Sequence, residues 1–312
     1  MIYELLITLA GAVLLYVGAE SLVRSSVSLS NRFRIPPMLI GLVIIGLGTS
    51  SPELVVSIEA TLKGSGEIAV GNVVGSNISN IALILGIAAL IWPVKVARNL
   101  ISIEVPVLIA ASLLMAILVY NGWVTRINGL LMLAGLGAYI IFKIRSHSAR
   151  TYPETEEWKG AKRGIRSFWL VLGTLAGLIL LIFGAELMIT GAIGLAETYQ
   201  LSEAVIGLTI VAVGTSLPEL ATAISAALRK QGDLILGGLI GSNILNILFV
   251  LGITAVVRPI ELTDITSIDL LLMTLLAVII WPIFRSDYLV SRFEGVVLLL
   301  IYTGYIAWLF IR

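Results

Sequence analysis

Ten apolar stretches, each long enough to cross a lipid bilayer, constrain the fold of this chain more than any other feature. About 20 predominantly apolar residues suffice for a helix to span the hydrocarbon core. Only 12% of the 312 residues are charged, against roughly 25% in soluble domains. The sequence therefore predicts an all-α polytopic membrane protein with ten transmembrane helices, at 2–24, 36–62, 68–92, 101–121, 127–145, 167–196, 203–228, 234–257, 267–284 and 293–311.

The basic residues predict how the chain is oriented in the membrane. Lys and Arg in short loops favour the cytoplasmic side. With the N-terminus outside, only Lys63, Arg126, Arg258 and Arg312 fall on the outer side, and the other sixteen of the 20 fall inside. We therefore predict a multi-pass protein of the cell membrane with both termini extracellular and a cytoplasmic linker at 146–166.

The two halves of the chain repeat each other without a gap, so that adding 166 to a residue number in the first half gives its counterpart in the second. Each half holds five predicted spans, an odd number, so the second copy must enter the membrane upside down. We predict two inverted-topology five-helix repeats, 1–145 and 167–312. Such repeats characterise secondary transporters, whose sites lie near the bilayer midplane where discontinuous helices meet. The corresponding segments include Gly18-Ala19-Glu20 with Gly184-Ala185-Glu186, Gly75-Ser76-Asn77 with Gly241-Ser242-Asn243, and Pro93 with Pro259.

The most polar repeated motif is Gly48–Leu54, which returns as Gly214–Leu220. Residues four apart share a helix face, so Thr49 and Glu53 should point together with Ser50 beside them. Thr215, Ser216 and Glu219 repeat this pattern. An ionisable residue at membrane depth is costly and indicates a functional site. If only one copy of the motif were present, the alternative would be a kinked membrane helix whose hydroxyl groups bond to its own backbone. Pro52, Gly46 and Gly48 predict that the span at 36–62 is broken.

A second repeated motif supplies further oxygen atoms. Ser76 with Asn80, and Ser242 with Asn246, are pairs four residues apart, and the alternative role for them is hydrogen bonding between packed helices. An oxygen cluster with two carboxylates suits a hard cation such as Ca²⁺ or Na⁺, whereas zinc and copper prefer His or Cys. The chain has no cysteine and one histidine. Two glutamates neutralise one Ca²⁺ or two Na⁺, so exchange of more than two Na⁺ per Ca²⁺ would move net charge.

At these residues the chain resembles a known family. Gly-Thr-Ser-x-Pro-Glu followed by Gly-Ser-Asn-Ile-x-Asn, twice, resembles the two alpha repeats of the sodium/calcium exchanger family, within the cation/calcium antiporter superfamily and particularly its short prokaryotic members. The resemblance covers nearly the whole chain and implies two inverted five-helix halves. It implies that Ca²⁺ is held by Glu53, Glu219, Thr49 and Thr215. It also implies Na⁺ sites formed by these residues with Ser50, Ser76, Ser216, Ser242 and the backbone carbonyls of Gly46 and Ala212.

One departure from the family pattern concerns the coupling ion. The Na⁺-coupled archaeal type carries Asn in the first repeat and an acid at the position of Asn246, whereas here Asn80 and Asn246 are both amides. The stoichiometry and the driving ion are therefore open. Proton/calcium exchangers usually have Asn where this chain has Thr49 and Thr215, which favours Na⁺, with H⁺ or K⁺ coupling as the alternatives.

Two other protein classes would use similar residues. A cation channel can line its pore with acidic side chains, but it conducts without a counter-ion. An intramembrane hydrolase would use the two carboxylates as an acid and base, which the surrounding hydroxyl groups disfavour. We predict a transporter and not an enzyme, with no resident cofactor, Ca²⁺ and Na⁺ as transported ions, and, at a net charge of +1, no nucleic-acid partner. The oligomeric state is not predicted.

Overall fold

Long helices make up nearly all of the regular structure. The computed structural model describes residues 2–33, 35, 37–64, 66–148, 167–198, 214–262 and 267–311. The first half contains α1 (Ile2–Phe33), α2 (Pro37–Ile40), the π-helix η1 (Gly41–Ile45), α3 (Gly46–Thr49), α4 (Ser51–Leu62), α5 (Gly66–Ile78), η2 (Ser79–Ile84), α6 (Leu85–Ile91), β1 (Val94–Lys95), η3 (Leu100–Glu104), α7 (Val105–Val119), β2 (Trp123–Val124) and α8 (Arg126–Ser148).

The described residues of the second half follow a similar order, although η3 has no π-helical counterpart at the start of α15. The second half contains α9 (Ser167–Thr198), α12 (Leu217–Leu228), α13 (Gly232–Leu245), η6 (Asn246–Val250), α14 (Leu251–Val257), β3 (Ile260–Glu261), α15 (Ser267–Ser286), β4 (Leu289–Val290) and α16 (Arg292–Ile311). Several bounds coincide when 166 is added to the residue number, because α4 then becomes α12 and α6 becomes α14.

The predicted spans are largely present as helices. Within the described ranges, eight helices are long and apolar enough to cross a membrane, as a multi-pass membrane protein requires. The predicted span at 36–62 is divided among α2, η1, α3 and α4, so its predicted break is confirmed. The predicted span at 203–228 is described only from residue 214. The first helix continues to Phe33 instead of ending at residue 24.

Both duplicated prolines stand in the first turn of a helix. Ser50 leaves helical geometry with φ −81° and ψ 5°, and α4 starts immediately after it with Pro52 in its first turn. Ser216 does the same before α12, with φ −88° and ψ 6° and with Pro218 following. Proline is tolerated there because the first N–H groups of a helix need no intrahelical partner. Each motif therefore starts a new helix within an apolar segment.

The strand pairs relate the two halves by an approximate twofold exchange. Strand β1 pairs with β4 in the antiparallel sense, with Val94 opposite Val290. Strand β2 pairs with β3, with Val124 opposite Ile260. Moving Val94 forward by 166 and Val290 back by 166 converts the first pair into the second. Each half therefore supplies one strand to each of the two short sheets.

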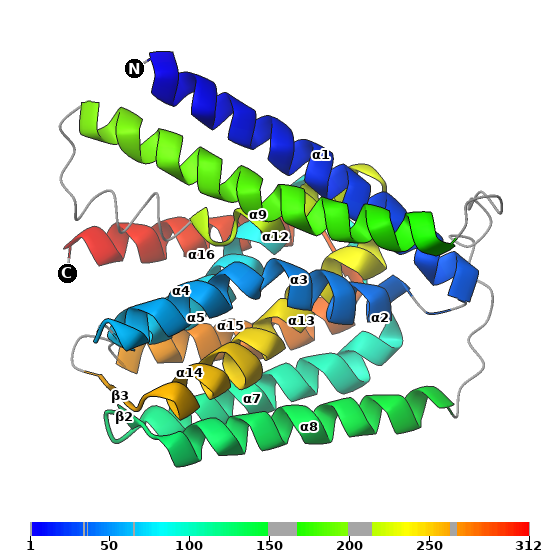
Figure 1. Cartoon of the computed structure of the whole chain (residues 1–312). Coiled ribbons are helices and arrows are strands. Elements are labelled where there is room, and N and C mark those ends of the chain that lie inside the picture. The colour runs from blue at the N-terminus through cyan, green and yellow to red at the C-terminus, as the bar shows by residue number, and fades with distance from the viewer. Residues whose placement is uncertain are drawn as a thin grey trace.

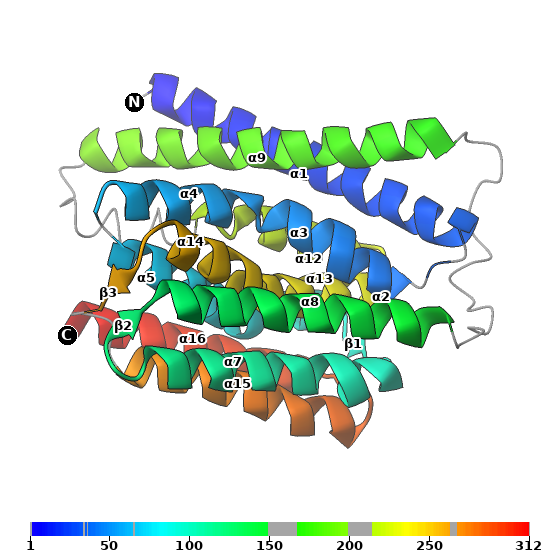
Figure 2. The ribbon, with the colours of Figure 1, turned by 60° about the horizontal axis from the view of Figure 1, so that its bottom comes forward.

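The longest helix pair shows the same exchange. A Cβ on Gly11 would lie 2.7 Å from the Gly184 carbonyl oxygen, and one on Gly18 would lie 2.9 Å from that of Gly177. These contacts interchange when 166 is added or subtracted, and they require α1 and α9 to run antiparallel. Figures 1 and 2 show the two helices crossing together on one face of the molecule. The backbones of α1 and α9 are in contact at both of these glycine pairs, which leaves no room for a larger residue there.

The molecule has two distinct ends, which we name by their strands. Both chain termini lie at the end that carries β2 and β3, the β2–β3 end (Figure 1). The last turn of α8 and the first turn of α9 lie at the opposite end, and Figure 2 shows β1 there, so this is the β1–β4 end. Between the two ends, the segments 66–91 and 232–257 are the most deeply buried of the candidate spans. They carry the second polar motif of each half.

Candidate cation site

The two duplicated glutamates are buried in the middle of the helix bundle. The Glu53 side chain is fully buried and Glu219 is 3% exposed, and the two carboxylates are close enough to interact electrostatically. Every described residue predicted for the site is buried. Ala212 lies outside the described residues. The buried set comprises Gly46, Thr49, Ser50, Glu53, Ser76, Asn80, Thr215, Ser216, Glu219, Ser242 and Asn246.

Thr49 lies against residues of the other half. Its Oγ1 is 3.3 Å from Ser242 Oγ and also donates to the Ile45 carbonyl oxygen at 2.9 Å. Thr49 is the last residue of α3 and Glu53 lies in the first turn of α4, so the break at Ser50 stands between them. That their side chains point together stays a prediction. Thr49 lines one small cavity with Glu219.

Ser242 joins three predicted site residues. Besides Thr49, its hydroxyl lies 3.4 Å from the Gly46 carbonyl oxygen and 3.5 Å from Glu219 Oε1. This is possible because α13 packs directly on the backbone of η1, where a Cβ on Gly241 would lie 2.7 Å from the Leu42 carbonyl oxygen. The glycine thus allows oxygen atoms from both halves to converge.

The opposite side of the site is built from α5 and the start of α12. Ser216 Oγ lies 3.5 Å from Ser76 Oγ, and Ser76 lies close to the Glu53 carboxylate without the geometry of a full hydrogen bond. Thr215 Oγ1 donates to Asn72 Oδ1 at 3.3 Å. The Ser76–Ser216 and Asn72–Thr215 contacts each join the first half to the second.

The asparagines of the second motif lie at the π-helical turns. The π-helix η2 begins at Ser79, one residue before Asn80, and η6 begins at Asn246, and such turns are frequent at functional sites. Asn80 Nδ2 donates to Asn243 Oδ1 at 2.9 Å. The amide of Asn246 is fully buried, and neither of its polar atoms has a hydrogen-bond partner among the described residues.

Several buried oxygen atoms of the site lack a hydrogen-bond partner within the described part of the chain. They are both carboxylate oxygens of Glu53, Glu219 Oε2, Ser50 Oγ, Asn80 Oδ1 and Asn246 Oδ1. An unsatisfied buried polar group costs about 1–3 kcal/mol, more when charged. The clustering of several such oxygen atoms in one place therefore indicates a binding site for a ligand. Oxygen atoms from carboxylates, hydroxyls and amides are the ligands of hard cations. Among the described residues, no group of three or more His, Cys, Asp or Glu side chains competes with this site for a metal ion.

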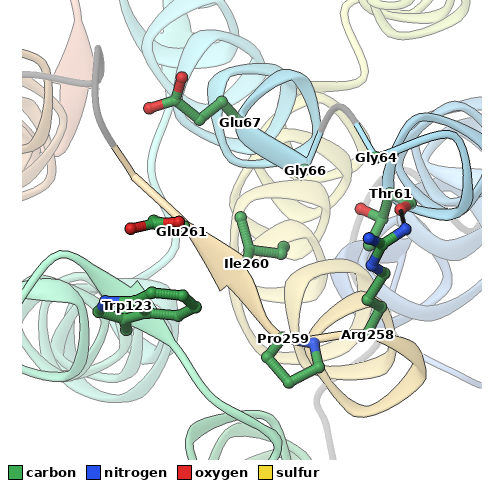
Figure 3. Close-up of a pocket in the computed structure, with 9 residues that line it drawn as sticks. All are labelled: Thr61, Gly64, Gly66, Glu67, Trp123, Arg258, Pro259, Ile260 and Glu261. Carbon is green, nitrogen blue, oxygen red and sulfur yellow. Dashed lines mark hydrogen bonds between the residues drawn. The ribbon is translucent and has the colours of Figure 1, made fainter.

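A larger pocket lies away from these residues, at the β2–β3 end. It has a volume of about 380 Å³, and its lining includes Trp123, Glu67 and Glu261. Figure 3 shows Arg258 on its opposite side, next to Thr61. Arg258 Nη1 lies 3.4 Å from the carbonyl oxygens of Thr61 and Leu62, so it closes the last turn of α4. None of the predicted site residues lines this pocket.

Three asparagines around the site were not among the predicted residues. Asn77 and Asn243 stand inside the repeated Gly-Ser-Asn sequence, so the motif itself was a signal for them. Asn72 gave no such signal, because its counterpart in the second half is Gly238. A comparison of the two half-sequences can identify only site residues that are present in both halves.

Comparison with protein families settles what kind of protein has this site. A family model described as "Sodium/calcium exchanger protein" matches residues 3–145 and 169–311. The chain belongs to the sodium/calcium exchanger family. The family is one of transporters, and the two matched segments fall on the two halves that carry the duplicated motifs.

Individual relatives of this sodium/calcium exchanger family member align over nearly its full length. "Putative antiporter CaxA" of Alkalimonas amylolytica is 35% identical over 322 residues, which cover 98% of each chain. "Sodium/calcium exchanger MaX1" of Methanosarcina acetivorans is 29% identical over 348 residues and also covers 98% of each chain. A solved structure of the sodium-calcium exchanger NCX_Mj, soaked with 10 mM Na⁺ and no Ca²⁺, is similar with a TM-score of 0.86 and 29% identity over 98% of both chains.

Proposed function

We propose that this protein is a secondary active antiporter that exchanges Ca²⁺ for Na⁺. The observation that carries the proposal is the pair of buried glutamates, one from each half, among unpartnered oxygen atoms. Family membership supports it, and so do the names of MaX1 and NCX_Mj. A buried carboxylate pair without a basic partner is expensive unless a cation neutralises it.

The contacts support a division of labour among the ligands. In this proposal Glu53, Glu219, Thr49 and Thr215 hold Ca²⁺. The serine hydroxyls of both motifs, with the carbonyls of Gly46 and Ala212, extend the site for Na⁺. Ser242 supports this extension, because its hydroxyl lies within hydrogen-bonding distance of Thr49, Gly46 and Glu219. NCX_Mj crystals soaked with Na⁺ together with Sr²⁺, a divalent cation like Ca²⁺, have a TM-score of 0.85 to this chain.

Transport by alternating access follows if the two halves are inverted repeats. The antiparallel crossing of α1 and α9 supports such repeats, as does the exchange of strand partners between the two sheets. In transporters of this kind, one group of helices moves against another around a fixed site. A cavity of about 670 Å³ between α1, α9 and α12 supports assigning the movement to α1 and α9, since they are not tightly packed against α12 there.

An ion pair at the β1–β4 end would hold one of the two states. Glu20 on α1 pairs with Arg229 at the end of α12 through two hydrogen bonds. Its carboxylate also accepts from Ser225 at 3.1 Å and pairs with Arg24 at 2.6 Å. With both termini outside, the β1–β4 end is cytoplasmic, so this cluster closes the route from the cytoplasm beside α12.

The counterpart of the Glu20–Arg229 pair in the register of the repeat is not formed. Moving Glu20 forward and Arg229 back by 166 gives Glu186 and Lys63. Glu186 is exposed and has no ion pair to a described residue, while Lys63 pairs with Glu59 on its own helix at 2.6 Å. In the opposite state, the two halves exchange arrangements, so Glu186 would pair with Lys63 and the Glu20–Arg229 pair would open.

Flux measurements under two different gradients test the proposal. The purified protein is reconstituted into liposomes loaded with Na⁺ and placed in Na⁺-free buffer with radioactive Ca²⁺. We expect Ca²⁺ uptake that requires internal Na⁺ and stops when the Na⁺ gradient is abolished. Uptake that ignores Na⁺ but follows an imposed pH gradient would replace Na⁺ by H⁺ as the driving ion. Ca²⁺ passage without any counter-ion would indicate a channel.

Coupling to H⁺ is the second candidate because of Asn246. Its amide is buried at the site and is uncharged, so the site has two carboxylates with which to hold the driving cations. A carboxylate that has released Ca²⁺ can take up a proton instead of Na⁺. The pH-gradient arm of the flux measurement decides between the two.

A further inference from the structure

Asn72 contacts both halves of the site through different atoms of its side-chain amide. Its Nδ2 lies 3.2 Å from the backbone carbonyl oxygen of Glu53 and 3.1 Å from Ser57 Oγ. Its Oδ1 accepts a hydrogen bond from Thr215 Oγ1 at 3.3 Å. One amide on α5 thus links the helix that carries Glu53 to the threonine of the second half.

The two contacts of Nδ2 fix the orientation of the amide. A carbonyl oxygen can only accept, so the atom that faces Glu53 must be the NH₂ group, and the oxygen must then face Thr215. Because Oδ1 has no proton, the Thr215 hydroxyl is the donor in that contact. The lone pairs of Thr215 Oγ1 therefore remain free to point elsewhere, and a hydroxyl ligand of a cation needs its lone pairs free.

The second half has no equivalent of this arrangement. In the register of the repeat, Asn72 corresponds to Gly238 and Ser57 to Ala223. Gly238 and Ala223 instead line a small cavity beside Thr49 and Glu219, of about 10 Å³, which is close to the space needed for one water molecule. Thr49 directs its proton to the Ile45 carbonyl of its own segment. Among the described residues, a hydrogen bond from a motif threonine to an asparagine of the other half is therefore found for Thr215 and not for Thr49.

We propose that Asn72 is a positioning residue that orients the Thr215 hydroxyl toward the bound cation and so raises the affinity of the site for Ca²⁺. The inference rests on the proposed function for the site itself. It concerns the binding step, so it can be tested separately from transport.

A double-mutant cycle on Ca²⁺ binding to the purified full-length protein tests the inference. The variants are Asn72→Leu, which removes the amide at similar volume, Thr215→Val, which removes the hydroxyl, and the double variant. We expect Asn72→Leu to weaken Ca²⁺ binding roughly five- to tenfold, the worth of one hydrogen bond. In the Thr215→Val background, the same change should have no further effect, because the hydroxyl that it orients is gone.

Two further variants separate positioning from a general structural role. Asn72→Asp keeps an oxygen that accepts from Thr215, so Thr215→Val should weaken Ca²⁺ binding in this background as much as in the unchanged protein. Ser57→Ala removes only the other neighbour of the amide and should change Ca²⁺ affinity less than twofold. Thermal unfolding without Ca²⁺ identifies any variant that fails to fold, and Asn72→Ala replaces Asn72→Leu in the cycle if the leucine variant does not fold.

Independent effects would overturn the inference, namely an equal loss of affinity on Asn72→Leu with and without the Thr215 hydroxyl. Unchanged Ca²⁺ binding in a folded Asn72→Leu variant would overturn it as well. A protein that binds Ca²⁺ with the expected cycle, yet shows no Na⁺-driven uptake in liposomes, would refute the proposed exchange and support the role of Asn72.

Discussion

At the scale of single residues, the main feature is two buried acids, Glu53 and Glu219, with no basic partner among the described residues. The other buried carboxylates with described contacts are satisfied. Glu104, for instance, accepts hydrogen bonds from Tyr139 and Lys143. Glu53 has no such partner among the described residues, and burial of an unpaired charge costs several kcal/mol. This contrast supports our proposal that Glu53 and Glu219 bind the cation, and it indicates a structural role for Glu104.

Neutralising either acid should abolish Ca²⁺ exchange. Glu53→Gln and Glu219→Gln each leave a divalent cation with one buried carboxylate, at a cost of roughly 3–5 kcal/mol, or more than about 100-fold in affinity. Radioactive Ca²⁺ uptake into liposomes measures the effect. Asp287→Asn, a change of the same kind on an exposed loop, serves as the control and should transport normally. Full uptake by either glutamine variant would refute the shared site.

The Asn246 amide allows the coupling to be changed. We expect Asn246→Asp to make the dependence of Ca²⁺ flux on Na⁺ steeper, because an additional carboxylate can hold an additional monovalent cation. The membrane potential at which net Ca²⁺ flux reverses reports the charge moved per Ca²⁺. Asn121→Asp, on an exposed turn, should leave that potential unchanged. An unchanged potential in Asn246→Asp would exclude residue 246 from the coupling.

Much of the site could be predicted at this scale, and the exceptions have physical causes. Repetition identified Glu53, Glu219 and the hydroxyls around them, because two copies of a costly residue are hard to explain by packing. It missed Asn72, whose counterpart is a glycine. Helix geometry also gave no signal that Thr49, at the end of α3, lies beside Ser242 of the other half. Side-chain partners across a helix break depend on tertiary packing, which helix periodicity does not describe.

At the scale of elements, close backbone contact between helices determines where the ligands lie. The helix α13 packs on α2, η1 and α3, and Gly41 and Gly241 are the points of closest approach. The breaks before α4 and α12 were predictable from Pro52 and Pro218, because proline fits the first turn of a helix. The π-helical turns were not predictable, since no residue type specifies a single wide turn.

A methyl group at the closest contact should disrupt the site. A Cβ on Gly241 would lie 2.7 Å from the Leu42 carbonyl oxygen and 2.8 Å from its Cα, so Gly241→Ala must push α13 away from η1. We expect lower thermal stability, by about 1–3 kcal/mol, and loss of Ca²⁺ binding. Gly304→Ala is the matched control, because a Cβ there meets no atom of the described residues within 4 Å. Normal binding by Gly241→Ala would show that this packing does not set the site.

At the scale of the whole molecule, the halves match in their scaffold and differ in their charged contacts. Each half supplies one strand to both strand pairs and one helix to the glycine contacts between α1 and α9. The Glu20–Arg229 pair is formed, and its counterpart is not. The register of the repeat and a multi-pass helical fold were predictable from sequence, because register and apolar length need no tertiary information; the described residues contain eight membrane-length helices, and ten spans stay a prediction. Which of the two ion pairs between the halves forms was not predictable, since Glu20 with Arg229 and Glu186 with Lys63 carry the same pair of charges.

Cross-linking tests whether the second ion pair forms in another state. The chain has no cysteine, so introduced pairs are the only reactive thiols. We expect a short bis-methanethiosulfonate, which joins two thiols through disulfide bonds, to link Glu20→Cys with Arg229→Cys, and also Glu186→Cys with Lys63→Cys. Each link should stop Ca²⁺ uptake until a reductant releases it. The mismatched pair Glu20→Cys with Lys63→Cys should not link. If only Glu20→Cys and Arg229→Cys ever link, the proposed second state, in which Glu186 pairs with Lys63, does not exist.

The stoichiometry of Ca²⁺ binding tests the central claim, that both motifs form one site, most directly. Titration calorimetry of the purified protein should show one Ca²⁺ per chain, with Na⁺ as a competitor. That binding should be lost in both Glu53→Gln and Glu219→Gln, because each acid belongs to the same site. Two Ca²⁺ per chain, with one retained in each single variant, would show two independent sites and contradict the account.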